Sequence, residues 1–433
     1  MITSIMLNSL SLLLTFYVGI NSFFRKKLYF MGVFVLIYSI LFCFVPIINN
    51  ILIGPAMYHP EALDGIITDI RIYNYYSIIN FLYALSIVFV YILVFNKSLK
   101  KKTDENVLTV KYNYSYISGC IFIIGVILYI YSTGFKATSL IELIKVILDA
   151  GRMAAFQNEG FSSLLLNISF YLMILIAYYS FSCSKKRNIF SILVYVMLIM
   201  ITVLMGGRQF IMLALSGYFF YYYYSKNYSS RKVIIFACIA FTFLVMWQIL
   251  RVGIYAGHMI ITKDDIKNVL LSGDFSYFYY ASLESIRKYL YNDWLFFGNT
   301  YRNLFFMVIP HEWTFGLKQQ DLSVYFADAF GSSGLMIRDG NYPPGLIGLF
   351  VLNFGFWGWL FVGWPFLFLI YTLEFLKRSS IIFVAFGVVY IQLILQFSRG
   401  TLMGFYQVFF LIIILFTFRT IHYNITKYYL PFK

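Results

Sequence analysis

The stretch SIINFLYALSIVFVYILVFN, residues 77–96, contains no charged side chain in 20 residues. A helix rises about 1.5 Å per residue, so a helix of this length crosses the roughly 30 Å hydrocarbon core of a bilayer. Charged residues stand outside the stretch, with Arg71 before it and Lys97 directly after it. Because an uncharged run of this length suits lipid, we predict that the stretch is a transmembrane helix.

Ten more runs share these properties, so we predict about eleven transmembrane helices. The bounds are approximately 4–22, 28–48, 77–96, 114–132, 161–182, 189–206, 209–225, 233–250, 345–373, 381–397 and 401–418. The composition agrees, because 61% of the residues are hydrophobic and 12% are charged, against about 25% charged in soluble domains. The glycines and Pro365 within 345–373 predict a kink or a re-entrant turn there. The predicted fold class is an all-α polytopic membrane protein.

The basic residues are distributed unequally between the two sets of loops. One set, together with the C-terminal tail, holds 19 of the 33 basic residues and three of the 18 acidic ones. Loops rich in lysine and arginine stay in the cytoplasm. The N-terminus is therefore predicted to lie outside and the C-terminus inside.

Three predicted outer segments are longer than simple turns: 49–76, 133–160 and 251–344. The third segment divides the chain into an N-terminal transmembrane bundle of eight spans (1–250), a large outer loop (251–344), and a C-terminal part of three spans and a tail (345–433). Within these segments we predict two amphipathic helices, 138–156 and 275–297, the second lying at the membrane interface with its aromatic side chains at headgroup level.

Several functional classes are disfavoured by the sequence. The formal net charge of +15 is explained by the cytoplasmic loops, so no nucleic-acid partner is predicted. The four cysteines and four histidines form no HExxH or CxxC pattern. We therefore predict neither a metal nor a cofactor.

Arg208 and Arg399 are isolated arginines, each between two predicted spans and at their outer end. Each has a neighbouring glycine, in MGGRQF (205–210) and FSRGTL (397–402). A guanidinium binds phosphate oxygens through two parallel hydrogen bonds, and a charge near the membrane suggests a function. The simpler alternative is that each arginine reaches out to lipid headgroups.

The large outer loop supplies further candidates. Its cations Arg251, Lys318 and Arg338 are candidate phosphate ligands, although nearby acids can pair with such residues. His311 is a candidate general base because an imidazole titrates near neutral pH, and Glu312 is the alternative base. Trp294 and Trp313 are candidates for stacking on sugar rings, or alternatively for anchoring at the interface. The acids Glu61, Asp64 and Asp69 of the first outer segment are a weaker set of candidates for a metal site or a base.

The chain resembles the oligosaccharide repeat unit polymerases, the Wzy-type O-antigen and capsule polymerases. The resemblance covers about residues 200–410 and rests on an ordered set of short motifs. These motifs are GGR (206–208), FGNTYRNLFFMVIP (297–310) with Lys318 after it, PPGLIGLFVLNFGFWGW (343–359) and SRG (398–400). In this family an arginine often follows the Ile-Pro of the large loop, where this chain has His311.

The resemblance implies the broad GT-C class of membrane glycosyltransferases that use polyprenyl-linked donors. It implies an undecaprenyl-diphosphate-linked oligosaccharide as both donor and acceptor, at the periplasmic face of a bacterial inner membrane. It also implies that Arg208 and Arg399 hold lipid diphosphates, and it leaves open a chain-length regulator as a partner. Two alternatives remain: an O-antigen ligase that uses the same donor, and a flippase or other transporter of lipid-linked oligosaccharides.

The predicted orientation can be tested by cysteine labelling in a background that lacks the four natural cysteines. A membrane-impermeant maleimide added to intact cells is expected to label Asp321→Cys, in the large loop. Lys185→Cys is expected to react only after the cells are permeabilised, because lysine-rich loops stay inside. The reverse labelling pattern would show that the orientation is inverted.

Overall fold

The structure is a computed structural model, and every regular element in the residues that it describes is helical. The described residues are 1–25, 28–52, 67–100, 216–217, 219–220, 223, 242, 246, 274–298, 301–303, 306, 311–317, 343–377, 380–402, 404–405, 408–409, 411–417 and 420. The chain divides into two compact units. The first unit contains 1–103, 234–375 and 393–406, and the remaining residues form the second.

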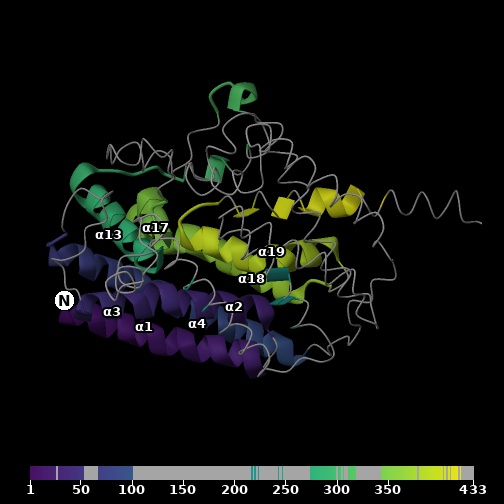
Figure 1. The fold of residues 1–433 in the computed structure, drawn as a ribbon, viewed down its shortest axis with the longest axis horizontal. Coiled ribbons are helices and arrows are strands. Elements are labelled where there is room, and N and C mark those ends of the chain that lie inside the picture. The colour runs from purple at the N-terminus through teal and green to yellow at the C-terminus, as the bar shows by residue number, and fades with distance from the viewer. Residues whose placement is uncertain are drawn as a thin grey trace, which may run out of the picture. The chain divides into compact units, whose positions relative to one another are not determined.

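The N-terminal helices of the first unit lie side by side (Figure 1). They are α1 (Ile2–Ile20), α2 (Tyr29–Tyr38), α3 (Val45–Leu52) and α4 (Ile70–Lys100). A π-helical turn, η1 (Asn21–Arg25), follows α1, and a second, η2 (Ser39–Phe44), joins α2 to α3. Because α2, η2 and α3 continue as one rod, this part of the chain makes three passes.

The buried and exposed faces of α1 are reversed relative to a soluble helix. Its fully buried side chains are polar, namely Ser4, Asn8, Ser11 and Thr15. Its most exposed side chains are apolar and include Ile2, Met6, Leu13 and Tyr17. Water would favour the opposite arrangement, whereas lipid accepts an apolar exterior with polar groups paired inside.

Asn80 of α4 is the centre of the buried polar network. Its amide donates to Asn8 Oδ1 at 2.9 Å and to the carbonyl of Phe42 at 2.8 Å. Its own amide oxygen accepts a hydrogen bond from the Tyr38 hydroxyl. The Phe42 carbonyl also accepts from the Tyr76 hydroxyl at 3.2 Å. Phe42 lies in η2, where the wider turn disturbs the regular hydrogen-bond ladder and lets a carbonyl bond elsewhere.

Three described helices are long and apolar enough to cross a membrane: Ile2–Phe24, Tyr29–Ile51 and Ile70–Lys97. They correspond to the predicted spans 4–22, 28–48 and 77–96, and each helix is longer than the span predicted for it. The coarse prediction of a helical membrane protein is confirmed for this part of the chain. The predicted spans between 114 and 206, and the helix predicted at 138–156, lie outside the described residues.

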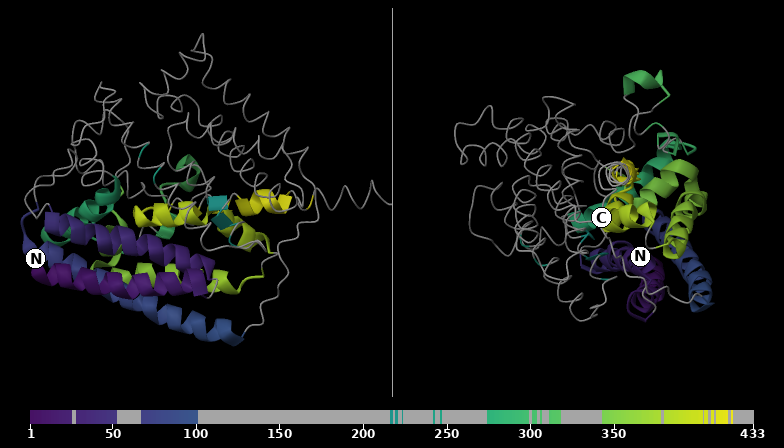
Figure 2. Two further views of the ribbon diagram at one scale, coloured as in Figure 1. Left: turned by 60° about the horizontal axis from the view of Figure 1, so that its bottom comes forward. Right: turned by 90° about the vertical axis from the view of Figure 1, so that its right-hand side faces the viewer.

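The predicted interfacial helix 275–297 is α13 (Asp274–Asn292), and its placement differs from the prediction. Tyr279, Leu283 and Ile286 are fully buried, and the helix packs against α3, α4 and α17 (Figure 2). Tyr279 donates a hydrogen bond to Asn50 Oδ1 at 2.9 Å. Partners for the tyrosine hydroxyls inside the bundle make burial favourable, and a sequence pattern does not reveal such partners.

The predicted span 345–373 is broken. It consists of α17 (Leu346–Phe354), η4 (Gly355–Trp357), η5 (Trp359–Gly363) and α18 (Trp364–Phe375). A Cβ atom at Gly358 would lie 1.9 Å from the Phe350 carbonyl oxygen. Residues eight apart in a straight helix are about 12 Å apart. The chain therefore folds back at Gly355, which has φ +57°, and this agrees with the re-entrant alternative.

Polar contacts between helix ends lie at the end of the first unit where α2 begins and α18 ends. Glu374 of α18 accepts from the Met31 backbone N–H in the first turn of α2 at 2.9 Å. The Lys97 amine lies 5.0 Å from the centre of the Tyr371 ring. A carboxylate at a helix N-terminus is favourable, and lysines concentrate at helix ends. This is the end predicted to face the cytoplasm, and we call the other end the predicted outer end.

The second unit is described only in part. The first residues of α19 (Ile381–Ser398) belong to it. The Phe220 and Phe383 rings are 5.4 Å apart, and the Ile391 backbone N–H donates to Ser216 Oγ at 3.1 Å. A Cβ atom at Gly387 would lie 2.1 Å from the Phe220 ring. The helical residues around 216–223 therefore pack closely on the first part of α19.

Asn80→Ala should destabilise the bundle, because it removes the side chain that bonds to Asn8 Oδ1, to the Phe42 carbonyl and to the Tyr38 hydroxyl. We expect a loss of about 1 kcal/mol in unfolding free energy, the usual size for a polar contact inside a membrane bundle. SDS titration of protein in mixed micelles measures this quantity. Leu85→Ala is the control, because Leu85 lies on the same helix and is exposed. Equal losses for the two variants would contradict a special role for the network.

Candidate functional site

Arg399 lies in the turn that ends α19. The N–H of Gly400 bonds to the Phe397 carbonyl at 2.9 Å, and the N–H of Thr401 bonds to the Gln396 carbonyl at 3.1 Å. Gly400 has φ +83°. This combination is a Schellman motif, in which glycine takes the left-handed position that ends a helix. The local sequence Ser-Arg-Gly thus ends α19 and makes Arg399 its last partly helical residue.

The turn at Arg399 contacts the beginning of α17. The N–H of Gly345 donates to the Arg399 carbonyl at 2.9 Å. A Cβ atom at Gly400 would lie 2.5 Å from the Gly345 carbonyl oxygen, so only glycine fits this approach. Gly345 is the N-cap of α17, and no side chain caps that helix. The positive end of the α17 dipole therefore lies beside the Arg399 turn.

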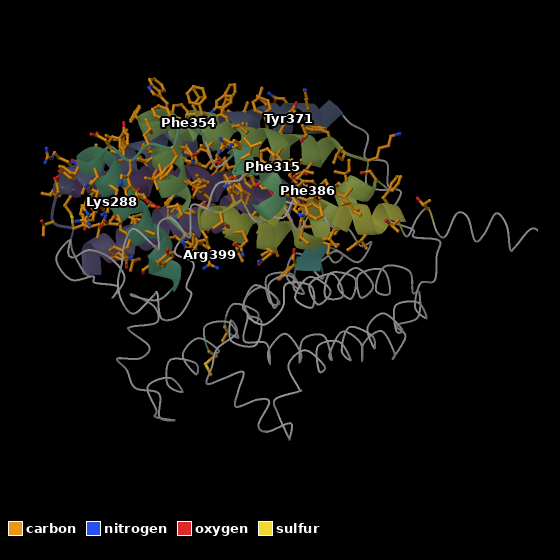
Figure 3. All side chains as sticks on the ribbon, turned by 90° about the horizontal axis from the view of Figure 1, so that it is seen from above. Lys288, Phe315, Phe354, Tyr371, Phe386 and Arg399 are labelled. Carbon is orange, nitrogen blue, oxygen red and sulfur yellow. The ribbon has the colours of Figure 1, made fainter. Side chains whose placement is uncertain are left out.

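Arg399 is recessed from the predicted outer end of the bundle. Its partner Gly345 lies beside the Phe278 backbone, and the Phe278 ring is 6.5 Å from the Phe42 ring. The Phe42 carbonyl bonds to Tyr76, which is six residues, or about 9 Å, beyond the start of α4. Figure 3 likewise shows Arg399 between Lys288 and Tyr371 along the bundle.

Among the described residues, Arg399 forms no ion pair with a carboxylate. Over the described stretches, the ion pairs are Arg71–Asp69 and Arg287–Glu284. Tyr277 of α13 lies close enough to interact electrostatically with the guanidinium, and its hydroxyl donates to the Pro343 carbonyl. A largely buried guanidinium without a carboxylate is unfavourable unless an anion can approach it. The turn can therefore accept an anionic ligand.

Other cations of the large loop have partners in the protein. Arg287 pairs with the fully buried Glu284 three residues earlier on α13. The Lys288 amine lies 5.5 Å from the centre of the Trp294 ring. Trp294 is half-buried, so one face of this predicted sugar platform is shared with a lysine. Both cations therefore interact with neighbouring side chains, as expected if the charges of the large loop are mostly paired within the protein.

The structure places the remaining predicted site residues only in part. Trp313 is 73% exposed and lies in the short helix η3 (His311–Thr314). The backbones of His311 and Glu312 belong to η3, and their side chains lie outside the description. Six further candidates lie entirely outside the described residues: Arg208, Arg251, Lys318, Arg338, Glu61 and Asp64. Their roles as site residues stay predictions.

Sequence reasoning missed the contribution of Tyr277 and of the α17 N-terminus. The Pro-Pro-Gly sequence at 343–345 did indicate the start of a helix, and glycine after Arg399 did indicate the end of one. Neither pattern indicated that these two points meet, since they are more than 50 residues apart in the sequence.

Comparisons with protein-family models, with curated proteins and with solved structures find no match for this chain. The fold and the described site therefore define only a class. The chain is a helical membrane protein with a recessed arginine at the meeting point of a helix end and a broken helix.

Gly400→Ala should distort the Arg399 turn, and Gly316→Ala is the matched control. Both glycines have positive φ, at +83° and +78°, and Gly316 has open space where a Cβ atom would be. Backbone strain alone costs about 1–2 kcal/mol, and the clash with Gly345 adds about 1–3 kcal/mol for Gly400→Ala. Unfolding free energies in mixed micelles test this difference. Equal losses for the two variants would show that the approach of Gly345 is not needed.

Proposed function

We propose that this chain polymerises undecaprenyl-diphosphate-linked oligosaccharide repeat units into O-antigen or capsular polysaccharide. The observation that carries the proposal is Arg399, a recessed arginine beside the N-terminus of α17 that pairs with no carboxylate of the described part of the chain. A lipid diphosphate is an anion tethered at the membrane, so it suits a cation within the bundle end. The ordered resemblance to repeat unit polymerases supports the same substrate.

The proposed reaction is a glycosyl transfer. A hydroxyl of the acceptor repeat unit attacks the anomeric carbon of the donor glycan, and the bond to the diphosphate oxygen breaks. The hydroxyl proton passes to a general base, for which His311 and Glu312 are the candidates. Undecaprenyl diphosphate leaves with the bonding electrons, and Arg399 with Arg208 would stabilise the charge that develops on it.

A transporter of the same lipid-linked oligosaccharide is the second candidate, and one observation favours it. The hairpin of α17 and α18 is a discontinuous helix with its N-terminus at a cation, a device that transporters use for anions. Transporters built from repeats carry such helices in pairs. In the described stretches α17 begins the one helix that folds back in this way, so the polymerase remains our first choice.

An O-antigen ligase is the third candidate, and cell phenotypes separate it from the others. Loss of a polymerase leaves single repeat units on the cell surface, loss of a ligase leaves the surface without them, and loss of a flippase leaves them on the inner leaflet. The purified chain, incubated with the lipid-linked repeat unit, should yield longer glycans only if it is a polymerase.

Arg399→Ala should reduce polymerisation by about a hundredfold or more, because it removes a charge-stabilising donor. Arg399→Lys should lose less, since it keeps the charge and loses the two-pronged geometry. Arg208→Ala should resemble Arg399→Ala. Gel analysis of glycan chains made in vitro measures the effect. Lys97→Ala is the control, because Lys97 lies at the end of the bundle that is predicted to face the cytoplasm. Full activity of the double variant Arg208→Ala/Arg399→Ala would refute the site.

A further inference from the structure

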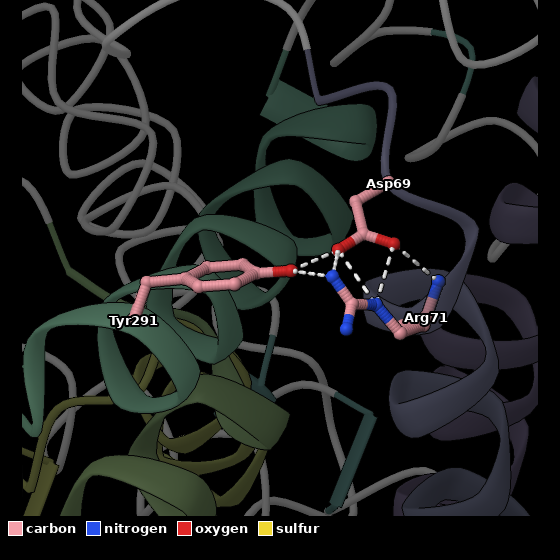
Figure 4. Close-up of polar contacts among 3 residues, drawn as sticks. All are labelled: Asp69, Arg71 and Tyr291. Carbon is pink, nitrogen blue, oxygen red and sulfur yellow. Dashed lines mark hydrogen bonds and ion pairs between the residues drawn. The ribbon is translucent and has the colours of Figure 1, made fainter.

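Three side chains from two distant parts of the chain meet at the predicted outer end (Figure 4). Arg71 Nε lies 3.2 and 3.1 Å from the two carboxylate oxygens of Asp69. Arg71 Nη2 donates to the Tyr291 hydroxyl at 2.7 Å, and this hydroxyl donates in turn to Asp69 Oδ2. We call Asp69, Arg71 and Tyr291 the outer triad.

Helix capping explains only part of the triad. Asp69 precedes α4 and accepts from the Arg71 backbone N–H at 2.9 Å, as an N-cap residue does. Capping requires neither the Arg71 guanidinium nor Tyr291, which comes from the last turn of α13. Arg71 is 78% exposed, and Tyr291 is 52% exposed. The triad therefore presents fixed donors and acceptors to the surroundings.

Aromatic rings continue from the triad along the same end of the unit. Tyr75, one turn after Arg71, lies 6.0 Å from the Tyr289 ring and 5.9 Å from the Phe356 ring. Phe356 is followed by Trp357, which is 56% exposed. Trp357 belongs to η4, at the point where the broken helix folds back. Polar groups and an exposed indole thus lie at the same end of the first unit.

One turn after Arg71, α4 carries a buried acceptor that has no partner among the described residues. Asn74 is three residues after Arg71, on the same face of α4. Its Oδ1 is buried and has no hydrogen-bond partner among the described residues. Buried polar atoms are nearly always paired, so Asn74 Oδ1 lacks a donor that a hydroxyl-bearing ligand could supply.

We propose that the outer triad, Asn74 and Trp357 form a binding subsite for the glycan, an inference that rests on the proposed function. A sugar offers hydroxyls that bond to a carboxylate and a guanidinium together, and an apolar face that stacks on an aromatic ring. The Arg71 and Tyr291 hydrogen bonds lower the pKa of Asp69 to about 2, so its carboxylate accepts at every physiological pH.

The charge of the triad favours a sugar over a phosphate headgroup. Arg71 and Asp69 compensate each other, so the triad itself offers no net positive charge to an anion. A headgroup phosphate needs an uncompensated arginine or lysine, as at Arg399. A neutral sugar can form hydrogen bonds through its hydroxyls to the paired carboxylate and guanidinium, and it can stack its apolar face on an aromatic ring.

The test uses the full chain in nanodiscs and the oligosaccharide that mild acid releases from the lipid carrier of the producing cells. Titration calorimetry measures Kd. Asp69→Asn and Trp357→Ala are each expected to raise Kd about tenfold, through a lost charged hydrogen bond and a lost stacking surface. Trp357→Phe should retain most of the affinity. Phe368→Ala is the matched control, because Phe368 is similarly exposed, at 53%, further along α18.

The outcomes separate the subsite from the proposed function. An unchanged Kd in both Asp69→Asn and Trp357→Ala overturns the subsite, as does wild-type protein that polymerises lipid-linked substrate without binding the released oligosaccharide. A Trp357→Ala variant that loses stability but keeps its Kd shows an interfacial anchor and overturns the stacking role. Binding that depends on the triad, without any polymerisation, supports the subsite and refutes the polymerase.

Discussion

The structure depends on the requirement that polar groups inside hydrocarbon find partners within the protein. Asn80 meets this requirement for three passes at once, because it bonds to Asn8, Tyr38 and the Phe42 carbonyl. Ser4 and Ser77 continue the network toward the predicted outer end, with their hydroxyls 2.5 Å apart. These contacts fix which face of α1 turns inward, and lipid-facing apolar residues occupy the remainder.

The same requirement shapes the broken helix. Ending α17 after nine residues exposes backbone groups at both of its ends, and such groups need partners at membrane depth. At the first end, the Gly345 N–H finds the Arg399 carbonyl. At the other end, the Phe296 N–H bonds to the Leu352 carbonyl at 2.7 Å. The segment after α13 and the turn after α19 therefore hold the hairpin in place.

The two proposed binding surfaces divide the chemistry of a lipid-linked glycan. Arg399 is charged and recessed and would receive the diphosphate, whereas the outer triad is compensated and exposed and would receive the sugar. Both surfaces border the hairpin of α17 and α18, one at Gly345 and the other at Trp357. A rigid hairpin would keep a fixed spacing between them, as positioning of a substrate requires.

The sequence by itself determined the membrane class and the spans at 4–22, 28–48 and 77–96, because uncharged runs longer than a bilayer are readable without any contact information. It also indicated the break near Gly355, and it singled out Arg399 as a candidate because this charged residue lies alone between two uncharged runs. It misplaced α13, since aromatic periodicity does not distinguish lipid from protein as the neighbour. Only the tertiary structure brought Arg399 to Gly345 and Asp69 to Tyr291, because these contacts join residues far apart in the chain and depend on how helices pack.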